Sequence, residues 1–208
     1  MSYDTRPVTL YHIPVEPPLK RIYTRLGYRK SKTLISEREQ QKIRKIIDNG
    51  IVYCQLAGIY ARIPIAEGDE QRVTLKNGIA WDSRNMANFL SASTEVFIMA
   101  ATAGSEIVEQ RDHCLQRDKT LQAVILDALA SEVVESAIQW IHDYLRNLIT
   151  QEGKRVTKRR YSPGYGDFAL ENQRDIFSCL HMEALDLQLT DHSILIPEKS
   201  VTAIVGIE

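Results

Sequence analysis

The chain has 208 residues, of which 44% are hydrophobic and 25% charged, a composition typical of folded globular proteins. Its 26 lysines and arginines nearly balance 27 aspartates and glutamates, so the formal net charge of -1 gives no overall attraction to nucleic acid or to an anionic membrane. No apolar run approaches the roughly 18 residues that span a bilayer, and the start MSYDTRPVTLYHIP lacks the features of a signal peptide, so we expect a cytoplasmic protein.

Cysteines and histidines are few and scattered along the sequence. The three cysteines form no C-x-x-C pair, and the five histidines form no H-E-x-x-H or similar ligand spacing. His113 and Cys114 are adjacent, but neighbours on a helix point in different directions and cannot form a catalytic pair. We therefore expect no disulfide framework, no metal site and no catalytic residues of a hydrolase in this chain.

The first half of the sequence predicts an extended segment, a helix and several strands. Four prolines within residues 1–35 indicate an extended segment that wraps around the core, which we place in residues 36–208. Ser36 and Glu39 form a capping box that begins an amphipathic helix, and Asn49-Gly50 ends it. The stretches IVYCQL, GIYARIPI, RVTL and IAW then predict strands, the last two joined through Asn77-Gly78 in a type I′ hairpin turn.

The second half predicts helices around one buried strand and a terminal strand. We expect a short helix over 83–90, then a buried strand in EVFIMAATAG that leads into a helix at Ser105 through an ordinary turn without phosphate-loop spacing. Apolar periodicity over 118–149 predicts one long helix or two collinear ones, with Glu135 at the border of its apolar face, either solvated or able to contact a ligand. A helix over 170–180 and the strand SVTAIVGI follow. Together these elements predict a single α+β domain over 1–208, with a mixed or antiparallel sheet packed against long helices. Whether the last strand pairs within the chain stays open.

A dense basic cluster at 154–160 runs directly into the turn sequence Tyr161-Ser162-Pro163-Gly164-Tyr165-Gly166. A nucleic-acid patch would need aromatic residues interleaved with the charges, and they are missing. A solvated loop is one interpretation. The other is a rigid turn in which Pro163 and Gly164 shape the backbone, Tyr161 and Tyr165 stack on a flat heterocycle and Arg160 binds a carboxylate. An amino-acid-bearing nucleoside would match these groups.

Several of these motifs resemble one known family. The pattern Arg160-x-Ser162-Pro163-Gly164-Tyr165, followed by a helix and by Leu-Thr-x-x-x-x-Leu-x-Pro-x-x-Ser-Val over 189–201, is similar to the activation domain of cobalamin-dependent methionine synthase. Ala128-Leu129-Ala130-x-x-x-x-Glu135 also resembles that family. The endings SPGYGDF and IPEKSVTAIVGI look closer to the free-standing activation proteins of anaerobic bacteria.

The resemblance implies a function, a fold and a set of ligand-binding residues. The fold would be methionine synthase activation domain-like, and the cofactors would be S-adenosylmethionine and a cobalamin carried by a partner protein or domain. The implied role is the reductive remethylation, or reactivation, of a cob(II)alamin-bearing methionine synthase or related corrinoid methyltransferase in methionine biosynthesis. Arg160 would bind the methionyl carboxylate, and the backbone at Ser162 and Gly164, with Tyr165, would hold the adenosyl part. Glu135 would face the site.

The partners implied are a corrinoid-binding protein or split methionine synthase, and a reductant such as flavodoxin or ferredoxin. The chemistry would occur at the partner's corrinoid, which leaves open whether this chain is itself an enzyme. Three differences from the long family form stand out: the chain stops at Glu208, it has Gly166-Asp167-Phe168 in place of a Pro-Ala-Cys-Pro-type stretch, and Ser131 replaces an acidic residue. We therefore expect a more open pocket, one completed by another chain, or one that binds the cofactor weakly.

Two alternatives remain. The first is a non-catalytic docking module for a corrinoid protein that does not use S-adenosylmethionine. The second, a methyltransferase acting on another small acceptor, is disfavoured because the chain lacks the glycine-rich loop of the common nucleotide-binding fold.

Overall fold

A curved antiparallel sheet forms the centre of the molecule in the computed structural model, which describes residues 5–28 and 35–208. Along the sheet the strand order is β4-β3-β2-β5-β8. The strand β1 pairs with the first part of β2, on the same edge of β2 to which β3 pairs further along. The strands are β1 (Val8–Tyr11), β2 (Ala57–Gly68), β3 (Arg72–Leu75), β4 (Ala80–Asp82), β5 (Glu95–Thr102) and β8 (Ser200–Ile207), and a separate small hairpin joins β6 (Gln188–Leu189) to β7 (Leu195–Ile196).

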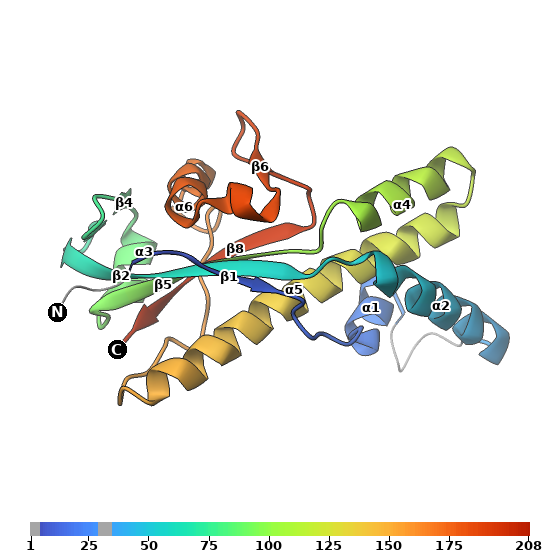
Figure 1. Cartoon of the computed structure of the whole chain (residues 1–208), viewed down its shortest axis with the longest axis horizontal. Coiled ribbons are helices and arrows are strands. Elements are labelled where there is room, and N and C mark those ends of the chain that lie inside the picture. Colours follow the sequence, from blue (N-terminus) through green and yellow to red (C-terminus); the bar gives the residue numbers. More distant parts are fainter. Residues whose placement is uncertain (1–4, 29–34) are drawn as a thin grey trace.

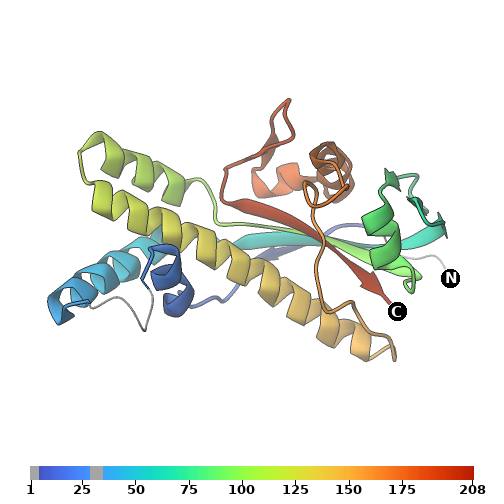
Figure 2. The same cartoon turned by 180° about the vertical axis from the view of Figure 1, so that it is seen from behind.

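Helices cover both faces of this sheet (Figure 1). The helix α5 (Thr120–Thr150) crosses one face of the sheet and extends beyond it, with α4 (Glu106–Gln116) packed beside its first half. The other face carries α6 (Gln173–Leu180) together with α3 (Arg84–Leu90), and the view from behind shows the same two layers (Figure 2). The remaining helices, α1 (Leu19–Arg25) and α2 (Glu37–Gly50), pack against the first half of α5.

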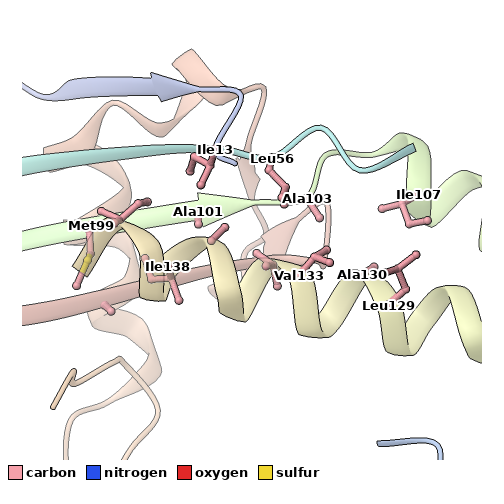
Figure 3. Close-up of a cluster of buried hydrophobic side chains, with 14 of the residues drawn as sticks. Ile13, Leu56, Met99, Ala101, Ala103, Ile107, Leu129, Ala130, Val133 and Ile138 are labelled. Carbon is pink, nitrogen blue, oxygen red and sulfur yellow. The ribbon is translucent and has the colours of Figure 1, made fainter. Parts of the chain in front are cut away.

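The central strand β5 is buried along its whole length because both of its faces are covered. Phe97, Met99 and Ala101 face the core beneath α5, which contains Leu129, Val133 and Ile138 (Figure 3). The alternate residues Val96, Ile98 and Ala100 face a second core beneath α6 and α3. The predicted α+β fold with an antiparallel sheet packed against long helices is confirmed.

Most predicted helices form where their sequence signals lie. The Ser36 side chain accepts a hydrogen bond from the Glu39 amide at 3.3 Å, so the capping box exists and begins α2. The periodic stretch forms the single helix α5, which contains no glycine or proline. Three residues of its predicted apolar face, Leu121, Tyr144 and Leu148, are nevertheless exposed.

Three sequence predictions for the first half are wrong. The segment 1–35, expected to be extended, contains α1 directly after Pro17-Pro18, although β1 does add to the edge of the sheet as expected. Its residues 1–4 and 29–34 lie outside the described part. Ile51–Tyr53 forms a 3-10 helix instead of a strand, continuing the turn that ends α2. The turn after β3 is not type I′, because Gly78 has a positive φ of 91° and Asn77 does not.

The terminal strand β8 pairs with β5 over its full length, which answers the question left open by the sequence. Its outer edge is partly covered by the segment 155–161, which follows α5. Tyr161 and Ile204 exchange backbone hydrogen bonds of 3.0 and 2.7 Å, and Arg155 and Glu208 exchange another pair of 2.9 and 2.8 Å. Between Ser200 and Ala203 this outer edge faces the cavity described next.

Candidate functional site

A cavity of about 790 Å³ lies at the outer edge of β8, beneath the turn 160–165. Most of its lining comes from Ser200–Ala203 of β8, one side of α5, the segment 158–165, and the region around the start of α6 with the β6–β7 hairpin, and Phe89 of α3 and Glu198 complete it. Because β8 is an edge strand here, the cavity reaches both faces of the sheet. Its volume lies within the range of about 300–1,000 Å³ that is usual for small-molecule sites.

Backbone alternation along β8 turns Thr202 towards the cavity. Ile204 and Gly206 direct their amide and carbonyl groups to the segment 157–161, so Thr202, two residues earlier, directs its own groups to the same side. The Thr202 carbonyl accepts a hydrogen bond from the Ser162 hydroxyl at 2.6 Å. The Thr202 amide thus offers a backbone donor at the cavity.

Arg160 is the charged residue that the sequence analysis placed first in the site, and it does line the cavity. Its Nη1 donates to Oε1 of Gln139 at 2.5 Å, and its Nη2 lies 3.7 Å from Oε2 of Glu135. Burial is the largest influence on the pKa of Arg160 and lowers it, while the carboxylates of Glu135 and Asp143 act in the opposite direction. An arginine stays protonated at neutral pH under these conditions, so the α5 side of the cavity carries a partly buried cation.

Glu135 lies on α5 at the rim of the cavity, as the border position on the helix predicted. Its side chain is 45% exposed and pairs only loosely with Arg160. One turn earlier, Glu132 has a different environment: it is buried and pairs with Arg21 and Arg25 of α1. The two glutamates therefore divide into one that holds α1 on α5 and one that is available at the cavity.

The turn 161–168 is fixed internally, and this limits what it offers a ligand. The Gly164 amide donates to the Phe168 carbonyl at 2.7 Å. Of the two backbone groups of Gly164, only the carbonyl is therefore not used in a hydrogen bond within the turn. Gly164 has a φ of 87°, as expected for a turn glycine, but it does not line the cavity, whereas its neighbours Pro163 and Tyr165 do. The Tyr165 side chain is 68% exposed and stands at the mouth.

Tyr161 does not have the stacking role that the turn sequence suggested. Its ring packs against Phe89 and Phe168 at centroid distances of 5.5 and 6.0 Å, within the core beneath α6. Its hydroxyl donates to the Tyr165 carbonyl at 3.2 Å. Tyr161 therefore supports the turn, and Tyr165 remains the exposed aromatic ring.

Gly166-Asp167-Phe168, which differs from the stretch that the long family form has here, has a structural role in this chain. The Asp167 carboxylate accepts hydrogen bonds from the Ser83 hydroxyl at 2.5 Å and from the Arg84 amide at 2.9 Å, so it caps α3. The Ser83 hydrogen bond, together with these backbone amides, holds the pKa of Asp167 below its usual range. Phe168 is fully buried against Trp81. These three residues anchor the far end of the turn on α3.

Several site residues lie outside the turn motif and were not predicted from the sequence, among them Gln139 and Gln173. Gln173, the first residue of α6, lines the cavity and its Oε1 accepts a hydrogen bond from the Thr202 hydroxyl at 2.8 Å. Gln139 lines it from α5 and holds Arg160. No local sequence signal marks either Gln139 or Gln173 as a site residue.

No group of three or more histidine, cysteine, aspartate or glutamate side chains within residues 5–28 and 35–208 is arranged to hold a metal ion. No helix in this part is long and apolar enough to cross a membrane. The polar lining of the cavity thus combines the cations of Lys158, Arg159 and Arg160 with the carboxylates of Glu135 and Glu198, and with side-chain amides, hydroxyls and backbone groups.

Comparison with known proteins was made at the level of sequence and of structure. No protein-family model matches the chain, and no curated protein matches its sequence. The structure is similar to the crystal structure of the MetH reactivation domain bound to AdoHcy, with a TM-score of 0.72 and 14% sequence identity over 96% of this chain and 78% of that chain. The chain therefore has the fold of that reactivation domain.

Proposed function

We propose that this chain binds S-adenosylmethionine in the cavity at the edge of β8. Two independent observations about the same part of the molecule support the proposal. The motif Arg160 to Tyr165, which resembles the activation-domain family, borders a cavity of suitable volume. The fold of the chain is that of a reactivation domain solved with AdoHcy. AdoHcy is the product that remains when S-adenosylmethionine gives up its methyl group.

The charged groups of the cavity suit the amino-acid part of this ligand. Arg160 presents a partly buried guanidinium that can bind a carboxylate through two parallel hydrogen bonds. Glu135 stands beside it and suits the ammonium group or the sulfonium of the same ligand. In the free protein these two side chains lie 3.7 Å apart, so each would exchange part of this contact for a contact to the ligand.

The remaining groups suit the adenosyl part. The Ser162 carbonyl and the Thr202 amide can supply backbone contacts, and the exposed ring of Tyr165 can close over a ligand at the mouth, whereas Gly164 lies outside the lining and shapes the turn between them. Two buried polar side chains of the wall, Gln173 and Ser193, have atoms without hydrogen-bond partners among the described residues. Unpaired polar atoms in a cavity wall fit a site that is completed by a polar ligand.

We further propose that the bound ligand serves the reductive remethylation of a cob(II)alamin-bearing methionine synthase or related corrinoid methyltransferase. In that reaction S-adenosylmethionine supplies the methyl group, while a reductant such as flavodoxin or ferredoxin supplies one electron to the partner's corrinoid. The chain itself binds and orients the ligand, and the reaction requires no nucleophile or general base from it. We expect it to act in the cytoplasm, as one unit over 1–208.

The function is tested by a reconstituted reactivation assay. A corrinoid methyltransferase in the cob(II)alamin state is mixed with a reductant and S-adenosylmethionine carrying a labelled methyl group. We expect methylcobalamin to form only when this chain is present, and Arg160→Ala to reduce its rate. Equal rates with and without the chain would contradict the proposal.

A docking module that does not use S-adenosylmethionine is the second candidate. It is favoured by one observation: the mouth of the cavity is apolar and exposed, with Tyr165 68% and Ile194 49% exposed. Such exposed apolar side chains at a rim are typical of a protein-binding surface. Capture of the corrinoid protein together with absent methyl transfer and absent ligand binding would establish this second function.

A further inference from the structure

We propose that Gln173 and Ser193 form the hydrogen-bonding end of the cavity and recognise the nitrogen-containing edge of the ligand's purine ring. The inference rests on the proposed binding of S-adenosylmethionine, and it names the residues that select the base. It concerns the α6 side of the cavity, away from Arg160 and Glu135.

Gln173 is buried, and the NH₂ group of its side-chain amide makes no hydrogen bond among the described residues. The residue is 5% exposed, and the Thr202 hydroxyl donates to its Oε1 at 2.8 Å. Its Nε2 has no partner among the described residues. Because the single hydroxyl proton of Thr202 is directed at Oε1, the amide is oriented with its two N–H donors unpaired. A buried donor without a partner is costly, which favours a ligand acceptor at this place.

Ser193 provides the second unpaired group. It is 2% exposed, its Oγ has no partner among the described residues, and it lines the same cavity. Its φ of 61° lies in the left-handed region, where the turn holds it through hydrogen bonds from the Ser193 amide and the Ile194 amide to Thr190. Glycine would adopt this conformation without strain. The position therefore places a hydroxyl in a strained turn where the fold itself gives it no partner.

The two groups stand out against the rest of the described chain. The other buried side-chain atoms without a partner there are Trp81 Nε1 and Ser93 Oγ, and neither residue lines this cavity. Two of these four atoms thus belong to residues that line one cavity.

The chemistry of this wall fits a purine better than a sugar or an amino acid. Around Gln173 and Ser193 the lining is apolar, with Leu170, Ile194 and Leu195. A purine has apolar faces and ring-nitrogen acceptors at its edge, so it matches apolar side chains with a few neutral hydrogen-bonding groups. A ribose carries hydroxyls on neighbouring carbons, and an amino acid carries charges, which the Arg160 side of the cavity suits. The ligand would therefore lie across the edge of β8, with its base on the α6 side.

The test combines ligand analogues with a variant that keeps the Thr202 contact. Titration calorimetry measures the affinity of the full chain for S-adenosylhomocysteine and for its 1-deaza, 3-deaza and 7-deaza analogues, each lacking one ring acceptor. We expect at least one analogue to bind the natural chain about fivefold more weakly or worse. Gln173→Glu retains an acceptor for Thr202 and loses the N–H donors. It should bind S-adenosylhomocysteine about tenfold more weakly and no longer discriminate against that analogue.

Ser193→Gly keeps the test valid if a carboxyl at position 173 disturbs folding, which circular dichroism detects. Glycine accepts the backbone conformation and removes only the hydroxyl. We expect an unchanged or raised melting temperature and about threefold to tenfold weaker binding of S-adenosylhomocysteine.

If Ser193→Gly binds like the natural chain, or if folded Gln173→Glu does, the inference is wrong while the proposed function stands. A discrimination against the analogue that persists in Gln173→Glu also overturns it. If the natural chain does not bind S-adenosylhomocysteine at all, the proposed function fails, and the inference fails with it.

Discussion

Arg160 and Gln139 join the turn of the site to the long helix: Nη1 of Arg160 donates to Oε1 of Gln139 at 2.5 Å. Gln139 in turn donates to the Asp143 carboxylate at 3.1 Å, so the arginine is held at the end of a hydrogen-bonded chain along α5. This contact orients the guanidinium at the cavity before a ligand arrives. Orientation in advance reduces the entropy that binding must overcome.

Replacing Arg160 tests whether this guanidinium binds the ligand. Arg160→Ala should weaken S-adenosylmethionine binding by about 1.5–3 kcal/mol, because a charge-assisted hydrogen bond to a carboxylate is lost. Arg160→Lys keeps the charge but not the planar fork, and it should give an intermediate affinity. Calorimetric titration measures all three proteins, and an unchanged affinity for Arg160→Ala would remove this residue from the site.

Gly166 shows how tightly the turn is built. A Cβ at this position would lie 2.8 Å from the Tyr161 hydroxyl and 2.3 Å from Nδ2 of Asn85, and φ is 59°. Asn85 can move its side-chain end, but Tyr161 is packed between aromatic rings. Gly153, with a φ of 72° and no atom within 4 Å of its Cβ position, is the matched control because it carries strain without crowding.

We expect Gly166→Ala to lower the free energy of unfolding by about 2–3 kcal/mol and Gly153→Ala by about 1 kcal/mol. Urea denaturation measures both. Equal losses would mean that crowding at Tyr161 contributes nothing.

Glu95 anchors the chain that leads from α5 to the turn. Its side chain is 4% exposed and pairs with Arg62 and with Lys154, the first residue of the basic cluster. Burial is the largest single influence on the pKa of Glu95 and would raise it, but the hydrogen bonds and charges of Arg62 and Lys154 together outweigh it and lower the pKa below its usual range. A carboxylate with a lowered pKa in the folded state stabilises that state above its unfolded pKa of about 4.3.

Glu95→Gln should therefore lower the free energy of unfolding at pH 7 by about 2–4 kcal/mol, because two cations lose a buried partner. The difference from the natural chain should shrink as the pH falls below about 4 and protonates Glu95 itself. Glu152→Gln removes a carboxylate that pairs with the same Arg62 but is 44% exposed, and it should cost about 1 kcal/mol or less. A loss for Glu95→Gln that does not change with pH would contradict the ion-pair explanation.

Local sequence signals predicted the elements that depend on local physics. The Ser36 capping box and the uninterrupted apolar period of α5 are properties of a few neighbouring residues, and both helices formed. The helix α1 was missed because it depends on tertiary contacts: Arg21 and Arg25 pair with Glu132, more than a hundred residues away. Pro17 and Pro18 favour an extended segment when the local sequence is considered alone, but proline is also well tolerated at the start of a helix.

The same division holds for the candidate site. The turn from Arg160 to Tyr165 is contiguous, so its motif was visible in the sequence. Gln173 comes to the cavity from α6, where it contacts Thr202 of β8, and Ser193 comes from the β6–β7 hairpin, which packs against β8. The predicted roles of Ser162 and Gly164 depend on their backbone groups. Only the structure shows which of these groups already make hydrogen bonds within the protein.

We propose that S-adenosylmethionine binds at the edge of β8 beneath the turn. Amide chemical shifts of the ¹⁵N-labelled chain, recorded by NMR during titration with S-adenosylmethionine, test both the binding and its place. We predict saturable shifts that centre on the amides of Ser162, Gly164, Thr202 and Gln173. No shift at millimolar ligand, or saturable shifts confined to a region away from β8 and the turn, would contradict the claim.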